Sequence, residues 1–398
     1  MVRMKSLRSN SRAMIHGWHT VSLIDAHMPA IDQSSLIQRS PRRLRLGFVA
    51  LTDAAPLIAA QELGLFARHG VEVELRREVG WATVRDKVIY GELEAAQAPA
   101  PLLWSAQLGL GGPRCDVLTA LVLNLHGNAI TLSARLQSAG VRHAASFRAE
   151  AHRRRGEARL TLGIVHPFSS HHLQLRQWLL AAGLEPEKDV RIVVVPPAQM
   201  FRNLAAGTLD GYCAGEPWGT VAVQAGQGWC PTWSARLSPG HVEKVLMVRT
   251  DFARDRSAEH FALVAALNDA CAWCDGPGNR PRLADWLAEP RYLDVPAQAI
   301  RPALIGRFDN GAGQIETVPD FHIFSRGGAN RPAHSAAAVL QNEMSAAGLL
   351  PSLLASADLP ARLFRTDLYQ AATSVQPDPT DASTLPSAIL KPIAPCLS

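Results

Sequence analysis

Residues 44–51 read LRLGFVAL and residues 160–165 read LTLGIV, so one strand-like pattern occurs twice at a spacing of 116 positions. Alternating apolar residues bounded by turn-forming residues predict a β-strand at both places. A second pair has the same spacing, because GELEAA begins at Gly91 and GTLDGY begins at Gly207. Two matches with one offset indicate an internal repeat, and we expect two similar lobes.

The order of elements within each copy is typical of an α/β fold. After the first strand, the sequence predicts a helix over 56–69, a second strand over 71–79 and a loop leading into a helix over 84–90. In the second copy, a strand over 190–195 takes the place of 71–79. Strands that alternate with helices form parallel sheets. The predicted fold class is therefore α/β, with two lobes and a ligand cleft between them.

The rest of the chain is expected to complete these lobes. A strand over 244–249 returns the chain to the first lobe, and helices follow over 257–274 and 331–350. The predicted division is a disordered tail over 1–42, the first part of lobe 1 over 43–135, lobe 2 over 136–243, the return to lobe 1 with C-terminal helices over 244–369, and a loose tail over 370–398.

The positive charge of the chain is concentrated at its N-terminus. The 398 residues carry a formal net charge of +5, but residues 1–45 hold eight Lys and Arg against two Asp, so the remaining residues are close to neutral. The run Arg153–Arg155 has no neighbouring aromatic residue beyond Phe147, whereas single-stranded nucleic acids are bound with interleaved aromatic side chains. We therefore expect no direct nucleic-acid partner.

The sequence predicts neither membrane insertion nor export. Its longest charge-free stretches, 95–113 and 117–134, are interrupted by polar residues and Gly or Pro, which suits buried strands and loops rather than a membrane span. Residues 13–31 contain three His and one Asp, so they form no continuous apolar core of a signal peptide. We expect a cytoplasmic protein, and the alternative is a periplasmic protein with an unrecognised export signal.

Enzyme and metal motifs are missing from the sequence. We find no G-x-S-x-G, P-loop or H-E-x-x-H string, and therefore expect no enzymatic activity. The single C-x-x-C, Cys271–Cys274, lies in an apolar periodic stretch without a second pair of ligands. We interpret it as two thiols packed along a helix, and we expect neither a metal nor a cofactor.

In a two-lobe α/β repeat, the ligand is expected at the carboxyl ends of the strands, between the lobes. The loops that reach this edge are 52–56, 79–83, 167–172 and 195–199. They lead into helix N-termini, whose free N–H groups and positive dipole ends suit a small anion. Two further strings, Gly127–Asn128 and Gly215–Glu216, compete for the same place.

Four residues near this edge are candidate ligands, each with a plainer alternative. Trp81 lies in a Gly/Thr loop rather than in an apolar stripe, which favours the cleft over the core. His171 is nearer the start of its helix than His172, although a histidine there can simply be solvated. Lys244 is one of only five Lys beside 35 Arg, and a surface lysine is an equal alternative. Glu216 belongs either to the cleft or to a plain turn.

Six strings are similar to the nitrate- and bicarbonate-binding protein family of ABC transporters. They occur in order between Leu44 and Leu350: LTDAAPLI from Leu51, WATVRD from Trp81, HHLQLRQWL from His171, VPPAQM from Val195, DGYCAGEPW from Asp210, and EK at Glu243. The TDAAPL and GEPW strings are the specific ones. The resemblance covers neither tail.

This resemblance implies a type II periplasmic-binding-protein fold that closes on an oxyanion, here nitrate or nitrite. The anion ligands of nitrate binders in the family correspond to Trp81, Asn128, His171, Pro197 and Lys244, and Gly215 and Glu216 border the same cleft. Bicarbonate binders of the family carry Glu in place of Lys244. Nitrate binders of transporters carry Gln in place of Asn128, so the shorter amide is a departure from the family pattern.

The resemblance extends to a cytoplasmic nitrate/nitrite sensor of nitrate assimilation, through GNAIT at 127–131 and FHIF at 321–324. Such a sensor holds an RNA-binding antiterminator of the ANTAR class and releases it when the anion binds. We therefore expect a sensor with this kind of partner. The alternatives are the binding component of a nitrate or bicarbonate transporter, and a small-molecule lyase on the same fold.

Overall fold

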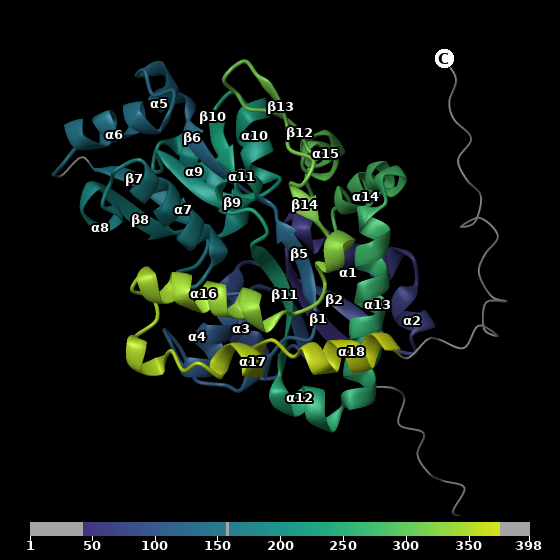
Figure 1. Ribbon diagram of the computed structural model, residues 1–398. Helices are drawn as coiled ribbons and strands as arrows, with labels where there is room; N and C mark the ends of the chain where they lie inside the picture. Colours follow the sequence, from purple (N-terminus) through teal and green to yellow (C-terminus); the bar gives the residue numbers. More distant parts are fainter. Residues whose placement is uncertain (1–42, 157–158, 375–398) are drawn as a thin grey trace, which may run out of the picture. The chain divides into compact units, whose positions relative to one another are not determined.

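A computed structural model describes residues 43–156 and 159–374 (Figure 1). The tail predicted over 1–42 and most of the tail predicted over 370–398 lie outside these residues. The prediction for residues 370–374 is wrong, because they belong to the last helix, α18 (Thr366–Ser374). Ala372 of this helix is buried, and the Tyr369 hydroxyl donates a hydrogen bond of 3.0 Å to Asn268 Oδ1. Helix α18 therefore packs against the preceding part of the chain.

The first sheet contains seven strands and combines parallel with antiparallel pairing. Its order is β14 (His322–Ile323), β5 (Val122–His126), β11 (Val242–Arg249), β3 (Ala95–Pro99), β1 (Leu44–Val49) and β2 (Val73–Glu78), and β4 (Val117–Leu118) pairs with β11. Strand β1 runs parallel to β2 and β3, and β11 runs antiparallel to β3. The late strand β11 thus lies inside a sheet that is otherwise built mainly from the first part of the chain.

The second sheet contains five strands and repeats the pairing of the first. Its order is β10 (Gly228–Trp233), β6 (Asn128–Ser133), β9 (Gly211–Gly215), β7 (Leu160–Ile164) and β8 (Val190–Val194). In the first sheet Leu46 pairs with Ala95, and in the second Leu162 pairs with Gly211. Both partners are displaced by 116 positions, so the repeat seen in the sequence is a repeat of strand register.

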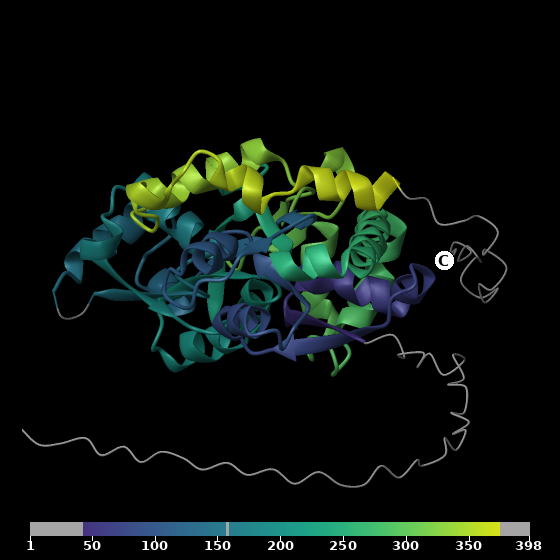
Figure 2. The ribbon, with the colours of Figure 1, turned by 90° about the horizontal axis from the view of Figure 1, so that it is seen from below.

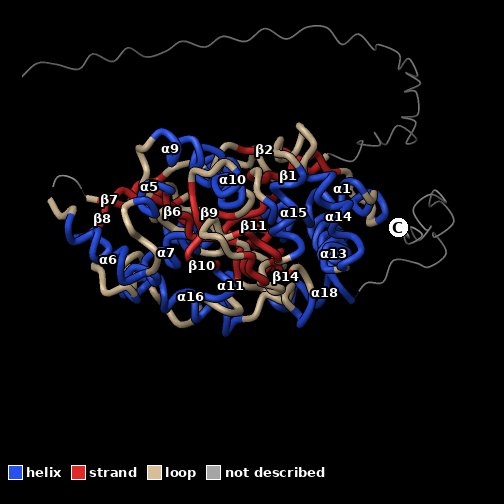
Figure 3. The backbone as a smooth tube through the Cα atoms, turned by 90° about the horizontal axis from the view of Figure 1, so that it is seen from above, coloured by secondary structure: helices blue, strands red, loops and turns tan. Residues whose placement is uncertain are grey.

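Helices surround both sheets, and Figure 3 shows them in blue around the strands in red. Their bounds are α1 (Ala55–Glu62), α2 (Leu65–Arg68), α3 (Trp81–Ile89), α4 (Leu102–Leu108), α5 (Ala134–Ser138), α6 (Ala144–Arg153), α7 (Ser170–Ala181), α8 (Pro186–Asp189), α9 (Met200–Ala206), α10 (Trp218–Gln224), α11 (Ser234–Leu237), α12 (Thr250–Asp255), α13 (Ser257–Asp275), α14 (Arg280–Leu287), α15 (Ala297–Ile305), α16 (His334–Ala346), α17 (Leu359–Leu363) and α18. Figure 2 shows α16, α17 and α18 in yellow along one side of the described chain.

One predicted helix is divided in the structure, and another is present as predicted. The helix predicted over 56–69 is divided into α1 and α2 by Gly64, whose φ of 65° is left-handed and interrupts the helical backbone. Helix α13 confirms the interpretation of Cys271 and Cys274, because both thiols are buried along it.

A membrane-spanning helix is not found among the described residues, because none of their helices has the necessary length and apolar character.

The chain passes between the sheets at positions that differ from the predicted boundaries. The first crossing is at Gly127 rather than after residue 135, because β6 already pairs with β9 in the second sheet. A later passage to the second sheet is made by the hairpin β12 (Arg307–Asp309) and β13 (Ile315–Thr317), which was not predicted and lies within the range 244–369 that was assigned to the first lobe. Its Phe308 ring packs against Trp233 at 5.4 Å between centroids, so the hairpin lies on the second sheet.

The first crossing needs a glycine. Gly127 has a φ of 107°, and a Cβ atom at this position would lie 2.3 Å from the His322 ring. The preceding residue, His126, also has a positive φ, of 62°. The backbone therefore turns sharply between β5 and β6, and it does so in contact with β14.

Candidate functional site

Strand β11 carries two adjacent charged residues, Glu243 and Lys244, whose side chains are completely buried. Lys244 Nζ lies 2.6 Å from Asp53 Oδ2 and 2.6 Å from Glu243 Oε1. A buried ammonium needs such partners, because transfer of an isolated charge out of water is very unfavourable. The lysine predicted from its rarity is therefore the centre of a buried ion cluster, and the alternative of a surface lysine is wrong.

Asp53 is placed by the turn that follows β1. Its Oδ1 accepts a hydrogen bond of 2.6 Å from Gln97 Nε2, and Gln97 belongs to β3. Burial raises the pKa of Asp53 above its ordinary value, and the neighbouring Lys244 ammonium opposes this rise. The carboxyl ends of β1 and β3 and the antiparallel β11 thus meet at one ion pair.

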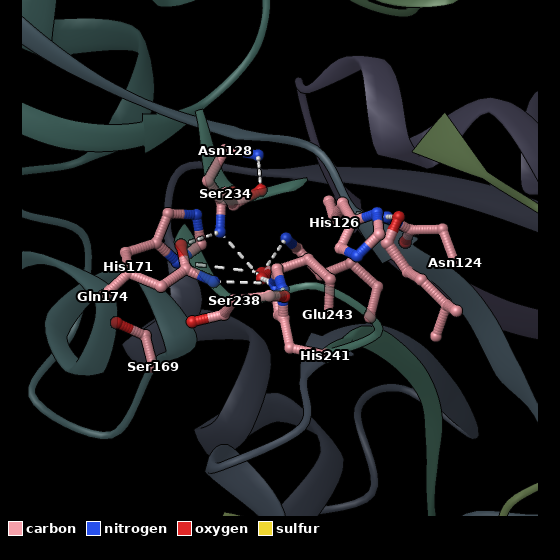
Figure 4. Close-up of polar contacts among 12 residues, drawn as sticks. Asn124, His126, Asn128, Ser169, His171, Gln174, Ser234, Ser238, His241 and Glu243 are labelled. Carbon is pink, nitrogen blue, oxygen red and sulfur yellow. Dashed lines mark hydrogen bonds and ion pairs between the residues drawn. The ribbon is translucent and has the colours of Figure 1, made fainter. Parts of the chain in front are cut away.

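Glu243 connects this ion pair to the second sheet. Its Oε2 accepts hydrogen bonds from Asn128 Nδ2 at 2.7 Å and lies 3.0 Å from His241 Nε2. Asn128 Nδ2 also donates to Gln174 Oε1 at 2.9 Å, and Figure 4 shows these side chains converging on Glu243. Burial alone would raise the pKa of Glu243, but Lys244, His171 and His241 together hold it well below its usual range.

His171 completes the cluster from helix α7. The side chain of Ser169 caps this helix by accepting a hydrogen bond from His172 N, which fixes where the first turn begins. His171 Nδ1 lies 3.8 Å from Glu243 Oε1, and neither ring nitrogen has a hydrogen-bond partner among the described residues. Burial lowers the pKa of His171 to about 3, Lys244 adds to the effect and Glu243 opposes it. The imidazole is therefore neutral at physiological pH.

Trp81 borders the cluster on the side of the first sheet. It is the first residue of α3 and follows the N-cap Gly80, so the prediction of a loop at this position is wrong. The indole is buried, its ring centroid lies 5.4 Å from Lys244 Nζ, and its Nε1 has no hydrogen-bond partner among the described residues. A tryptophan at a helix start can thus present both its ring and its N–H to the cluster.

Gly215 and Glu216 contribute differently from each other. Gly215 pairs with Asn128 across β6 and β9, and a Cβ atom there would lie 3.5 Å from Asn128 Oδ1. The Glu216 carboxylate is directed away, because its Oε2 accepts a hydrogen bond of 3.0 Å from Thr220 N in α10. The Glu216 backbone contacts the turn after β1, where its carbonyl accepts a hydrogen bond of 2.8 Å from Thr52 N. Burial raises the pKa of Glu216 to about 7.

Pro197 lies at the edge of this region. It is buried and begins a short 3-10 turn after β8. The neighbouring Pro196 faces Gly80, with 3.9 Å between its Cβ and a Cβ built on the glycine. Within the described chain, no hydrogen bond joins Pro197 to the buried cluster. The structure thus brings Trp81, Asn128, His171 and Lys244 together and leaves Pro197 beside them.

Four members of the cluster were not predicted as site residues: Asp53, Gln174, His241 and Glu243. Signals for three of them were present in the sequence. Asp53 stands in the TDAAPL string, Glu243 directly precedes Lys244, and Gln174 follows His171 by three positions, which places it on the same face of α7. No comparable pattern identified His241.

The charges of the cluster do not favour an additional anion by themselves. Asp53 and Glu243 supply two carboxylates around the single ammonium of Lys244, and His171 is neutral. Lys244, predicted as an anion ligand, is therefore already paired with two carboxylates. Some buried polar atoms of the cluster nevertheless have no hydrogen-bond partner among the described residues: Trp81 Nε1, both ring nitrogens of His171 and Asn128 Oδ1. In the part of the chain that the structure describes, no acidic, His or Cys cluster is suited to a metal ion.

A cavity of about 700 Å³ lies between α7 and α16, next to the cluster. Its polar wall includes Gln174 and His241, whose side-chain nitrogens are 2.6 Å apart. Its apolar wall includes Leu173, Leu237 and Leu340. The cavity is therefore lined by Gln174 and His241, two residues of the hydrogen-bond network around Glu243.

Comparisons with known proteins agree on one family. A model described as the NMT1-like family matches residues 38–288. The chain is 35% identical over 332 residues to the nitrate import ATP-binding protein NrtC of Synechocystis, covering 83% of this chain and 49% of that protein. It therefore spans about half the length of this relative. It is 31% identical over 338 residues to the nitrate/nitrite binding protein NrtA of Synechococcus elongatus, covering 82% of this chain and 76% of that protein.

Solved structures give the same result for the fold. The crystal structure of the periplasmic nitrate-binding protein NrtA from Synechocystis is similar with a TM-score of 0.80 at 27% identity, over 83% of this chain and 88% of that one. The alkanesulfonate-binding protein SsuA of Xanthomonas axonopodis is similar with a TM-score of 0.59 at 16% identity, over 83% of this chain and 98% of that one. The predicted periplasmic-binding-protein fold is confirmed.

Proposed function

The chain belongs to the NMT1-like family, and from this premise we propose that it binds a small oxyanion, nitrate or nitrite, at the buried cluster around Lys244. The observation that carries the proposal is that Trp81 Nε1 and the ring nitrogens of His171, which have no hydrogen-bond partner among the described residues, lie beside the buried Lys244 and Glu243. Buried polar groups are nearly always hydrogen-bonded, so these atoms are suited to a ligand. Relatives named as nitrate/nitrite binding proteins support nitrate or nitrite, and relatives named for bicarbonate transport support bicarbonate as the competing ligand.

The shape of the site suits a planar ion. The Trp81 indole supplies a flat apolar wall, and its Nε1–H and one N–H of the His171 ring supply directed donors. Sites of this kind combine an apolar surface with a few placed polar groups that fix the orientation of the ligand. Bicarbonate has the same planar outline, so it is the competing ligand.

The test is calorimetric titration of the full chain with nitrate, nitrite and bicarbonate. The informative variant is Trp81→Phe, which keeps the ring and removes the indole N–H. A hydrogen bond to a charged group contributes about 1.5–3 kcal/mol, so we expect affinity to fall by about tenfold or more. The matched control is Trp229→Phe. Both indoles are buried in hydrophobic clusters and have an Nε1 without a partner among the described residues, but Trp81 lies 5.4 Å from Lys244 Nζ, whereas Trp229 belongs to the hydrophobic cluster of the second sheet. Equal losses in both variants, or no binding of any of the three anions, would contradict the proposal.

For the cellular role we propose a cytoplasmic nitrate/nitrite sensor that works with an ANTAR-type antiterminator. The resemblance of residues 127–131 and 321–324 to sensor proteins supports this role. The second candidate is the binding component of an import system, which the names of the relatives favour. Affinity purification of the full chain from its cells distinguishes them. An antiterminator released on addition of nitrate supports the sensor, whereas recovery of permease and ATPase components supports import.

We propose that the protein is not an enzyme, because the relatives are named as binding or import proteins. A lyase on this fold is the remaining alternative. Turnover of an organic substrate by the purified chain, lost in Trp81→Phe, would favour that alternative.

A further inference from the structure

The cavity between α7 and α16 has the size and the lining of a small-molecule site. Its volume of about 700 Å³ lies within the range of about 300–1,000 Å³ that small organic ligands occupy. Leu180 and Val339 line it, and they are 56% and 57% exposed although both are large and apolar. Apolar surface exposed around a hollow is typical of a place where a ligand binds. A ligand in this cavity would cover apolar surface that the protein itself leaves in water.

The two walls of the cavity belong to different hydrophobic clusters, which explains why the cavity is not filled. On α16, Leu340 packs in the cluster of the first sheet, and Gln341 Oε1 accepts a hydrogen bond of 2.9 Å from Trp104 Nε1 in α4. On α7, Leu175 and Leu179 pack in the cluster of the second sheet. Each helix is therefore fixed to its own sheet, and neither cluster extends into the space between the helices.

Glu343 gives the cavity a negative charge without a partner. Three ionisable side chains line the cavity, Arg176, His241 and Glu343. Arg176 forms an ion pair with Glu187, and His241 Nε2 lies 3.0 Å from Glu243 Oε2. Among the described residues, no basic side chain lies within ion-pair distance of Glu343. Partial burial raises the pKa of Glu343, and the nearby His241 opposes this rise.

This distribution of charge favours a positively charged ligand. An ammonium group beside Glu343 would pair with the one lining charge that is not already used. An anion would instead face the Glu343 carboxylate, and the guanidinium of Arg176 is already paired with Glu187. A cation with an apolar body therefore matches both the charge and the apolar lining.

A buried hydroxyl without a partner also lines the cavity. Ser170 directly precedes His171 on α7, and it is only 3% exposed. Its Oγ has no hydrogen-bond partner in the part of the chain that the structure describes. Buried polar groups nearly always have such a partner. Ser170 is thus a second polar group, besides Glu343, that a ligand of this cavity can satisfy.

We propose that the cavity between α7 and α16 is a second binding site, distinct from the oxyanion site, which takes a small organic cation with an aliphatic body. The ammonium group of the ligand lies at Glu343, and its aliphatic body lies along Leu173, Leu237 and Val339. The inference goes beyond the proposed function, because it concerns another ligand in another place.

The experiment is calorimetric titration of the full chain with octylammonium chloride below its micelle concentration. The matched probes are sodium octanoate and octanol, which have the same number of carbon atoms but a negative or a neutral end. At about pH 8 a glutamate is ionised and an alkylamine is protonated. We expect octylammonium to bind about fivefold more tightly than octanol, since an ion pair near the surface contributes modestly, and octanoate to bind least tightly.

Two variants locate the ligand, each with a matched control. Ala336→Trp places an indole in the cavity, and we expect the affinity for octylammonium to fall by about tenfold or more, the effect of about two methylene groups left in water. Its control is Ala338→Trp, because Ala338 belongs to the same helix but does not line the cavity. Glu343→Gln should make the affinities for octylammonium and octanol equal. Its control is Glu92→Gln, an exposed glutamate outside the cavity.

The outcomes decide both the ligand class and the place. Octylammonium that binds no more tightly than octanol would overturn the assignment of a cationic ligand. Affinity unchanged in Ala336→Trp, or lowered equally in Ala338→Trp, would overturn the location, provided that circular dichroism shows both variants folded. Binding of none of the three probes, the result expected if a second copy of the chain covers the cavity, would overturn the inference. Failure of the chain to bind nitrate, nitrite or bicarbonate would overturn the proposed function alone.

Discussion

Lys244 lies between Asp53 and Glu243, so removal of its ammonium leaves two carboxylates facing each other in a buried site. Loss of one partner of a buried ion pair typically costs about 3–5 kcal/mol. We therefore expect Lys244→Met to lower the free energy of unfolding by that amount, with the urea unfolding midpoint as the measurement.

The control for this change is Lys188→Met. Lys188 forms an exposed ion pair with Glu185 at 2.6 Å, and exposed pairs contribute about 0–1 kcal/mol. If Lys244→Met lowered the free energy of unfolding no more than Lys188→Met does, the buried cluster would contribute no more to stability than an exposed ion pair.

At the residue scale, the sequence predicted which side chain types would matter but not the charge of their surroundings. Trp81, Asn128, His171 and Lys244 do meet in the structure. The resemblance to a binding family could not show that Lys244 is neutralised, because that depends on Asp53, which lies 191 positions earlier in the chain. Contacts over such separations are set by the pairing of β1, β3 and β11.

At the element scale, the turn from β5 to β6 is the most demanding connection. Gly127→Ala would add a Cβ atom 2.3 Å from the His322 ring in a backbone with φ of 107°. Strain in this region and a buried clash each cost about 1–3 kcal/mol. We expect this variant to unfold at a clearly lower urea concentration than wild type.

Gly313→Ala separates the two contributions. Gly313 also has a positive φ, of 85°, but nothing lies within 4 Å of a Cβ atom there. It therefore reports the backbone strain alone, at about 1 kcal/mol. If the two variants were equally stable, the contact between the crossing and β14 would contribute nothing.

The elements themselves were largely predictable, and the exceptions have physical causes. The strands β1 and β7 follow from the local alternation of apolar residues. The pairing of β1 with β3 has the same register as the pairing of β7 with β9, and this agreement follows from the 116-residue repeat. The hairpin β12–β13 was not foreseen, because it is held by packing of Phe308 on Trp233 rather than by a local pattern. Helix α3 begins at Trp81 because Gly80 serves as its N-cap without a polar side chain.

At the scale of the whole molecule, buried histidines make stability depend on pH. Burial lowers the pKa of His126, His166 and His260 to about 4 and that of His171 to about 3, compared with about 6.5 in an unfolded chain. Between these values the unfolded chain binds more protons than the folded protein. Stability is therefore lost as the pH falls below 6.5, by up to about 1.4 kcal/mol per pH unit for each histidine.

Glu216 acts in the opposite direction. Its pKa of about 7 lies above that of an unfolded glutamate, so its protonation favours the folded state as the pH falls, and it offsets one histidine. Urea unfolding midpoints at about pH 7.5 and about pH 5.5 measure the sum. We expect the lower midpoint at the lower pH and a smaller difference in His260→Gln. A midpoint that rises on acidification would contradict this prediction.

The position of β11 has a consequence for the synthesis of the protein. This strand lies between β5 and β3, yet it is translated after every strand of the second sheet. The first sheet therefore cannot close until residues 242–249 have left the ribosome, whereas the five strands of the second sheet are complete at Trp233. Since domains fold as units during translation, the half of the protein that begins later along the chain is expected to finish folding first. Chains stalled shortly beyond Trp233 should resist protease over residues 128–233 and be cleaved within residues 44–126, and the reverse pattern would exclude this order.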